Sequence, residues 1–240
     1  MNSESKPEIN VAERTVPRGG EPQELDERLF MQLQVFTGAA KHTALLDSLQ
    51  GSGLAGVLYR DTLDPQGIGL LTWNADPSHF ATTVRDFLAE SPFAGLSHRP
   101  SMTMLGRTYA IGYEPELKDW LLDKPRRNAT DPAMPWAVWY PLRRTGAFAT
   151  LSVEEQRGIL AEHGRIGLAY GQKGLARDIR LACHGMDTHD NEFVIGLIGS
   201  RLHPLSHLVQ RLRATKQTAG YIQSMGPFFI GYAVWQKAEA

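Results

Sequence analysis

Several features that define common classes of protein are missing from this sequence. The chain of 240 residues has one cysteine, Cys183, so it cannot form an intrachain disulfide, and a cysteine-rich zinc or iron–sulfur site lacks its ligands. The 25 lysine and arginine residues nearly balance the 26 aspartate and glutamate residues, which removes the electrostatic case for nucleic acid as the main partner. A local basic pocket for a small anion is still compatible with this composition.

Long apolar segments are absent too. No segment approaches the roughly 20 apolar residues of a membrane-spanning helix, so we expect no membrane partner. The N-terminus lacks the basic and apolar regions of a secretory leader, and we therefore expect a cytoplasmic protein. With 42% hydrophobic residues, the 240-residue chain is long enough to bury one large or two small cores.

Residues 1–27 are polar and rich in proline and glycine. Such a segment has too little apolar surface to offset the entropy that ordering costs. We predict a disordered tail here. The alternative is a segment that clasps a neighbouring subunit.

The rest of the chain shows one order of elements twice. Residues 28–115 predict a strand over 31–36, a helix over 39–50, a hairpin over 56–73, a helix over 76–90 and a strand over 102–113. Residues 136–240 predict a strand over 136–142, a helix over 152–170, strands over 177–183 and 193–198, a helix over 203–215 and a strand over 227–234. No strong identity links the halves, so only the element order repeats. The pattern predicts an α+β fold of two ferredoxin-like βαββαβ units, whose antiparallel sheets carry helices on one face.

The helix predicted over 152–170 presents a histidine on its apolar face. It opens with Ser152 and Glu155, which form a capping box. The residues at helical spacing behind this start are Ile159, His163, Ile166 and Tyr170. His163 is therefore either a core histidine bonded to a backbone carbonyl or an axial ligand to porphyrin iron, because haem iron binds a neutral imidazole. The pattern alone does not choose between them.

A proline-rich segment, 116–135, separates the halves and carries the basic residues Lys124, Arg126 and Arg127. One interpretation is a solvated crossover between the halves. The other is an anion site, because arginine offers paired donors to carboxylates such as porphyrin propionates.

Residues 136–232 resemble the chlorite dismutase family of haem proteins, and within it the coproheme decarboxylases. The segments that carry this resemblance are Trp139-Tyr-Pro141, Glu162-His-Gly-Arg-Ile-Gly-Leu-Ala-Tyr170, Gly185-Met-Asp with Asn191-Glu-Phe-Val, Leu212-Arg-Ala-Thr215 and Pro227-Phe-Phe-Ile-Gly231. The resemblance implies a duplicated ferredoxin-like chain of the dimeric α+β barrel type. It also implies assembly as a homopentamer and a haem site in the C-terminal half, over 136–240.

The same resemblance assigns roles to single residues. His163 stands at the position of the proximal iron ligand and is the one metal ligand expected. Arg126 stands at the position of a propionate-binding arginine, and Lys124 beside it can serve likewise. Thr218 stands near a propionate-contacting serine. Tyr140 matches the redox-active tyrosine of the decarboxylases, although a strand tyrosine with a local hydrogen bond is the alternative.

Two departures from the family pattern bear on the activity. Chlorite-degrading members have a distal arginine thirteen residues after the proximal histidine, and this chain has Ala176 there. Arg177 is adjacent, but one step along a strand points to the opposite face. An acidic partner of the proximal histidine is replaced by Lys216 or Gln217, which weakens the ligand. Both departures argue against chlorite chemistry.

The sequence thus predicts an oxidoreductase that converts iron coproporphyrin III (coproheme) to haem b with hydrogen peroxide, in which Tyr140 removes hydrogen from a propionate. Iron porphyrin is then both substrate and redox centre. Two alternatives share the family resemblance. One is a haem-binding or peroxidase-like protein without decarboxylase activity, and the other is a scaffold that has lost porphyrin.

Overall fold

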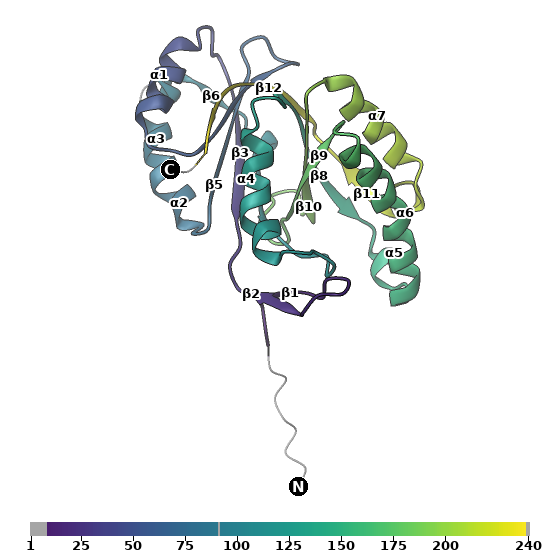
Figure 1. Cartoon of the computed structure of the whole chain (residues 1–240). Helices are drawn as coiled ribbons and strands as arrows, with labels where there is room; N and C mark the ends of the chain where they lie inside the picture. Colours follow the sequence, from purple (N-terminus) through teal and green to yellow (C-terminus); the bar gives the residue numbers. More distant parts are fainter. Residues whose placement is uncertain (1–8, 91, 239–240) are drawn as a thin grey trace.

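Eight strands, four from each half of the chain, close into one antiparallel barrel (Figure 1). The computed structural model describes residues 9–90 and 92–238. Around the barrel the strands follow the order β10-β9-β7-β3-β5-β4-β12-β8, and β8 pairs with β10 to close it. Their bounds are β3 Phe30–Thr37, β4 Gly56–Asp61, β5 Ile68–Asn74, β7 Met104–Thr108, β8 Trp136–Arg144, β9 Arg177–Ala182, β10 Phe193–Gly199 and β12 Phe229–Lys237.

The two halves meet at two antiparallel seams. β4 pairs with β12, and β7 pairs with β9, so each half completes the sheet of the other. Within each half the order of elements is βαββαβ, as the sequence predicts. The predicted α+β class with antiparallel sheets is confirmed, and the sheets of both repeats belong to one barrel.

Helices cover the outer face of the barrel in two groups (Figure 1). The first half contributes α1 (Thr43–Gly51), α2 (Ser78–Ala81) and α3 (Thr83–Ala89), and the second contributes α5 (Gly146–Ala149), α6 (Val153–Gln172), α7 (Leu202–Arg213) and α8 (Lys216–Tyr221). Short elements complete the fold: η1 (Phe93–Gly95), β6 (Ser97–His98), η2 (Pro100–Met102) and β11 (Ile222–Met225). The single helix predicted over 76–90 is interrupted at Thr82, whose ψ of −90° is not helical. In the described part of the chain, no helix combines the length and apolar character needed to cross a membrane.

The barrel interior and its outer faces form separate apolar cores. The interior core joins both halves and includes Trp73, Tyr59, Trp139 and Phe229. Packing there is tight, because a Cβ added at Gly196 would come within 2.5 Å of the Trp139 ring. Under α6 and α7 lies a second core, which includes Val138, Tyr140, Ala176 and Leu197 among its buried members and Ile166 at its edge. This second core is the setting of the candidate site.

The segment 116–135 differs from the predicted proline-rich crossover. It contains a π-helical turn, η3 (Asp119–Asp123), that runs into α4 (Lys124–Thr130). Pro125 lies in the first turn of α4, where the missing N–H is not needed for an intrahelical hydrogen bond. Leu121, Leu122 and Ala129 are buried in the interior core. The interpretation as a solvated crossover is therefore wrong for residues 119–130, which are helical and pack against the barrel strands (Figure 1).

The described part of the predicted tail also carries structure. β1 (Glu13–Thr15) pairs with β2 (Gln23–Leu25). Glu13 accepts hydrogen bonds from the Arg107 side chain and the Ala110 backbone, each at 3.0 Å. Thr15 is buried and donates to the carbonyl of Glu114 at 3.2 Å. Residues 9–27 are thus fixed to the barrel, contrary to the prediction of disorder, and residues 1–8 lie outside the described residues.

Candidate functional site

The candidate site begins with the helix that carries His163. Ser152 and Glu155 form the predicted capping box, with the Glu155 carboxylate accepting from the Ser152 backbone at 3.0 Å. This cap fixes the first residue of α6 and therefore the face on which every later residue lies. His163 is half-buried on the side of α6 that faces the barrel core, together with Ile166.

The imidazole of His163 is held by the residue that caps α8. Its Nδ1 lies 3.3 Å from the Oγ1 of Thr215, the buried N-cap residue of α8. With Nδ1 engaged in this way, Nε2 is the ring nitrogen that remains for a ligand. The contact joins residues that are 52 positions apart in the sequence.

The surroundings of His163 keep its ring neutral. Burial and, after it, the positive charge of Arg180 lower the pKa of His163 to about 4. The carboxylates of Glu162 and Asp178 oppose this change. A neutral imidazole at physiological pH is the form that binds a metal.

Strand β9 presents an ion pair on the face that carries Ala176. Side chains alternate along a strand, so Ala176, Asp178 and Arg180 share one face. Arg180 and Asp178 are bonded to each other at 2.6 Å. Across the neighbouring strands, Arg180 is in register with Ile195, and Ile195 is in register with Tyr140. The cation and the tyrosine therefore lie in one row of the sheet.

Tyr140 is packed into the wall of this face. It is 3% exposed, and its ring stacks on Phe228 with centroids 4.7 Å apart. Burial raises the pKa of the phenol well above its usual value, and the Asp178 charge raises it further, while Arg213 opposes both. The phenol therefore keeps its proton at neutral pH.

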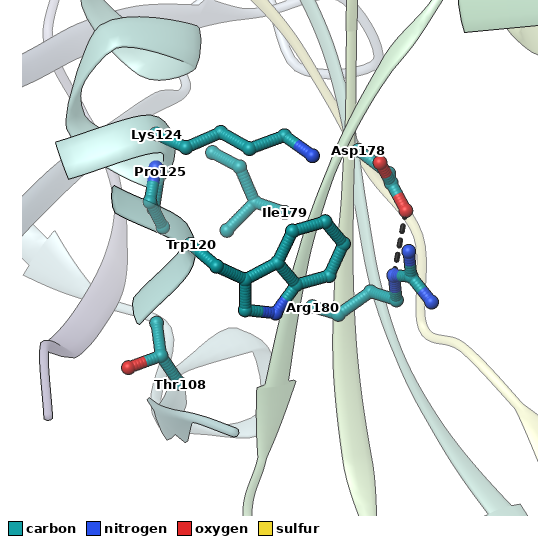
Figure 2. A pocket seen from close by; sticks show the side chains of 7 residues that line it. All are labelled: Thr108, Trp120, Lys124, Pro125, Asp178, Ile179 and Arg180. Carbon is teal, nitrogen blue, oxygen red and sulfur yellow. Dashed lines mark ion pairs between the residues drawn. The ribbon is translucent and has the colours of Figure 1, made fainter. Parts of the chain in front are cut away.

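A small pocket lies beside the ion pair, between α4 and β9 (Figure 2). Lys124 reaches from α4 and Arg180 from β9 toward the same indole, that of Trp120. The Lys124 Nζ is 3.8 Å and the Arg180 guanidinium carbon 5.1 Å from the centroid of that ring. Burial lowers the pKa of Lys124. The cavity between the side chains, about 20 Å³, is lined by Thr108, Trp120, Lys124, Pro125, Asp178, Ile179 and Arg180.

The structure separates Arg126 from Lys124. The two residues are two positions apart on α4, which turns them roughly 200° away from each other around the helix axis. Arg126 forms an ion pair with Asp123 at 3.8 Å, whereas Lys124 lines the pocket. The two predicted anion-binding cations thus do not face one pocket.

Hydrogen bonds connect one of the other predicted residues, Thr218, to the partner of His163. Thr218 lies in α8 with its Oγ1 3.4 Å from that of Thr215, the partner of His163. Ala176 is buried in the same core as Tyr140. Arg177 is bonded to Asp131 at 2.7 Å, as its position on the opposite face of β9 leads one to expect.

Sequence reasoning missed two groups in this site. Thr215 is hydrogen-bonded to His163. Lys216 and Gln217 were expected in place of the acidic partner of the histidine, but Lys216 donates its backbone N–H to Glu162. The Oε1 of Gln217 is buried without a hydrogen bond among the described residues. Arg180 was also missed. The available signal was the spacing from Ala176 to Arg180, an even number of residues along a predicted strand, which places both side chains on one face of the sheet.

A metal ion at His163 would have to bring further ligands with it. Within residues 9–90 and 92–238, no group of three or more histidine, cysteine, aspartate or glutamate side chains is arranged to hold a metal ion. His163 can therefore supply one ligand to a metal whose other positions are filled by a bound group.

Known structures share this fold. A haem-binding protein from Thermus thermophilus superposes with a TM-score of 0.69 at 18% identity, covering 92% of this chain and 96% of that chain. A variant of chlorite dismutase from Candidatus Nitrospira defluvii gives 0.67 at 14% identity, and the complex of that enzyme with imidazole gives 0.64 at 14%. Both cover 88% of this chain and 93% of the other. At such identities the likeness shows the fold alone.

The sequence comparison is more specific about ancestry. No curated protein matches the chain. The family model described as chlorite dismutase matches residues 71–234, which is more than half of the 240 residues and includes α4, β8, α6 and β9. This protein therefore belongs to the chlorite dismutase family.

Proposed function

We propose that this protein binds iron porphyrin through Nε2 of His163 and that its reaction is the peroxide-dependent decarboxylation of coproheme to haem b. One observation carries the binding half of the proposal. His163 is a half-buried, neutral imidazole whose Nδ1 is engaged by Thr215, which leaves Nε2 for iron. The proposal agrees with the name of the Thermus relative, a haem-binding protein.

The residues around His163 fit a flat, apolar ring with acidic substituents. Gly167 follows His163 by one helical turn, and a Cβ there would meet no atom within 4 Å, so the helix surface beside the ligand is open. Ile166 and Tyr140 supply apolar wall. Lys124 and Arg180 supply cations for carboxylates, and a single protein ligand is what porphyrin iron needs.

The proposed reaction balances with peroxide as the oxidant. Each propionate that becomes a vinyl group loses carbon dioxide, one proton and two electrons. Hydrogen peroxide takes up two electrons and two protons and gives two water molecules. Conversion of coproheme, which has four propionates, to haem b, which has two, therefore consumes two peroxide molecules. The iron porphyrin supplies the redox chemistry, and the protein supplies position and electrostatics.

Tyr140 is the proposed catalytic residue. Its phenol is protonated at neutral pH, so it can give up a hydrogen atom as a proton and an electron. The stacked ring of Phe228 fixes its orientation. Arg180, in the same row of the sheet, is placed to hold a substrate carboxylate near that hydroxyl. These residues position the propionate and remove its hydrogen.

A second candidate function is haem binding without decarboxylation. Tyr140 favours it in one respect, because a ring that is 3% exposed and stacked on Phe228 is also what a purely structural tyrosine shows. In that case the His163 site is unchanged, and the propionates are bound but not oxidised.

Two measurements on the purified protein test the proposal in sequence. Addition of coproheme should produce a shifted Soret band with a saturable titration, and addition of peroxide should then convert the bound coproheme to haem b, seen by mass spectrometry. A shifted band with intact propionates would support the second candidate. If coproheme causes no spectral change, the protein does not bind it, and the remaining alternative is the scaffold that has lost porphyrin. The predicted homopentamer belongs to the same proposal, and light scattering coupled to size exclusion measures it.

A further inference from the structure

The hydroxyl of Thr215 has four hydrogen-bond neighbours, one of which is the Oγ1 of Thr218 at 3.4 Å. The Oγ1 of Thr215 is 2.7 Å from the carbonyl oxygen of Leu212 at the end of α7. The backbone N–H of Thr218, in the first turn of α8, points at the Thr215 Oγ1 from 3.4 Å. The fourth neighbour is Nδ1 of His163 at 3.3 Å. One buried hydroxyl thus joins α6, α7 and α8.

Counting donors and acceptors decides the direction of each bond. A threonine hydroxyl has one proton to donate and two lone pairs that accept. A carbonyl oxygen can only accept, so the short contact with Leu212 takes the proton of Thr215. The Thr218 N–H can only donate, so it uses one lone pair of Oγ1. The Thr218 hydroxyl can donate or accept, so it does not fix a direction. Because the one proton of Oγ1 goes to Leu212, the contact with His163 is attractive only if Nδ1 carries a hydrogen.

We propose that Thr215 is the positioning residue of His163, holding the imidazole in its Nδ1–H tautomer so that Nε2 is the bare nitrogen. The consequence of this tautomer, iron binding by Nε2, rests on the proposed function. The tautomer itself is a property of the ligand-free protein. The cap of α8 gives the arrangement its rigidity, because Oγ1 cannot turn toward another partner without breaking the bond to Leu212.

A neutral acceptor also sets the character of the ligand. A carboxylate in this place draws the Nδ1 proton and makes the imidazole a stronger donor to iron, whereas a hydroxyl that already donates elsewhere draws it weakly. Among the charged groups, Arg180 has the largest effect on the pKa of His163, and its charge is positive, whereas that of a carboxylate is negative. Within the proposed function, Thr215 therefore makes His163 a well-oriented ligand with little imidazolate character.

The tautomer is measured directly in the ligand-free protein. Two-bond nitrogen–proton correlation spectra of the ¹⁵N-labelled chain at neutral pH distinguish a protonated from a bare ring nitrogen for each of the 8 histidines. The signal of His163 is assigned as the one lost in His163→Asn. We expect Nδ1–H in the wild type, a mixture with Nε2–H in Thr215→Val, and recovery of Nδ1–H in Thr215→Ser, which keeps the hydroxyl. A wild-type signal from Nε2–H, or no change in Thr215→Val, would overturn the proposal.

Haemin titration separates this inference from the proposed function. Loss of a partner that orients a metal ligand typically costs about tenfold or more in affinity, so Thr215→Val should bind haemin at least about tenfold more weakly than Thr215→Ser. If Thr215→Val does not fold, the wild-type spectrum alone decides the tautomer, and Thr215→Ala replaces it in the titration. A wild type that holds Nδ1–H but binds no haemin supports the inference and contradicts the proposed function. A wild type that binds haemin but holds Nε2–H when ligand-free contradicts the inference alone.

Discussion

Arg180 and Tyr140 lie in one row of the barrel, joined through Ile195 on the strand between them. Their strands are two positions apart, so their backbones are separated by roughly 10 Å, a distance that two long side chains can span. His163 of α6 senses the charge of the same Arg180. The proposed function assigns the cation, the phenol and the imidazole to one substrate, and each can be tested separately.

Replacement of the phenol tests the proposed chemistry. Tyr140→Phe keeps the ring that stacks on Phe228 and removes the hydroxyl hydrogen. We expect coproheme affinity within about twofold of wild type and loss of decarboxylation by peroxide, seen by mass spectrometry. The spectrum with bound coproheme serves as the control for folding. If the variant still loses carbon dioxide, Tyr140 is a structural residue.

The two cations of α4 should differ in effect. Lys124 lines the pocket, whereas Arg126 lies on the opposite side of the helix. A hydrogen bond to a charged group contributes about 1.5 kcal/mol or more, so Lys124→Ala should weaken coproheme binding by about tenfold. Haem, with two carboxylates in place of four, should lose less, and Arg126→Ala should change either affinity by less than about threefold. Equal effects of the two substitutions would place Lys124 outside the binding region.

The face of β9 predicts the outcome with chlorite. Ala176 offers no cationic donor at the position of the distal arginine, and the nearby cation, Arg180, is assigned to a substrate carboxylate in the proposed function. We expect no appreciable release of oxygen from chlorite in an electrode assay of the protein loaded with haem. Rapid release that disappears in Arg180→Ala would mean that Arg180 does supply the missing cation.

The lowered pKa of His163 predicts a dependence of stability on pH. Its folded pKa of about 4 lies below the unfolded value of about 6.5, so the unfolded chain binds the extra proton between these values. Stability is therefore lost as pH falls from about 6.5 to 4, by at most about 3 kcal/mol from this group. Urea denaturation of the ligand-free protein at both ends of the window measures the loss. His163→Gln should lack the share of this stability loss that the His163 titration causes. An equal loss in the wild type and in His163→Gln would contradict the assigned pKa.

Local signals explain the parts of the fold that the sequence predicts well. The capping box of Ser152 and Glu155 starts α6 where expected, and the alternation of strand residues gives all eight barrel strands. Both signals depend on near neighbours in the chain. The position of His163 on the buried side of α6 follows from the same spacing.

The errors have long-range causes. Pro125 suggests an irregular crossover, but it lies in the first turn of a helix. The preceding residues Leu121 and Leu122 are buried because the closed barrel lies beneath them. The hairpin of residues 13–25 is held by Arg107, far along the chain. Local composition contains neither partner, so it predicts a loop and a tail.

The site shows the same limit. Thr215 approaches His163 because α8 folds back on α6, and no spacing in the sequence encodes a contact across 52 positions. Arg126 was grouped with Lys124 because a loop leaves both free to turn, whereas a helix sends them to opposite sides. Contacts between elements therefore decide which of the predicted residues share a pocket.

Iron coordination by His163 is the central claim, and one comparison tests it most directly. Wild type and His163→Ala are titrated with coproheme, and the Soret band is recorded together with far-ultraviolet circular dichroism. Alanine favours the helix and removes only the ligand, so the variant should stay folded. We expect a saturable, shifted Soret band in the wild type and no such band in the variant. An identical shifted band in a folded His163→Ala protein would contradict the account.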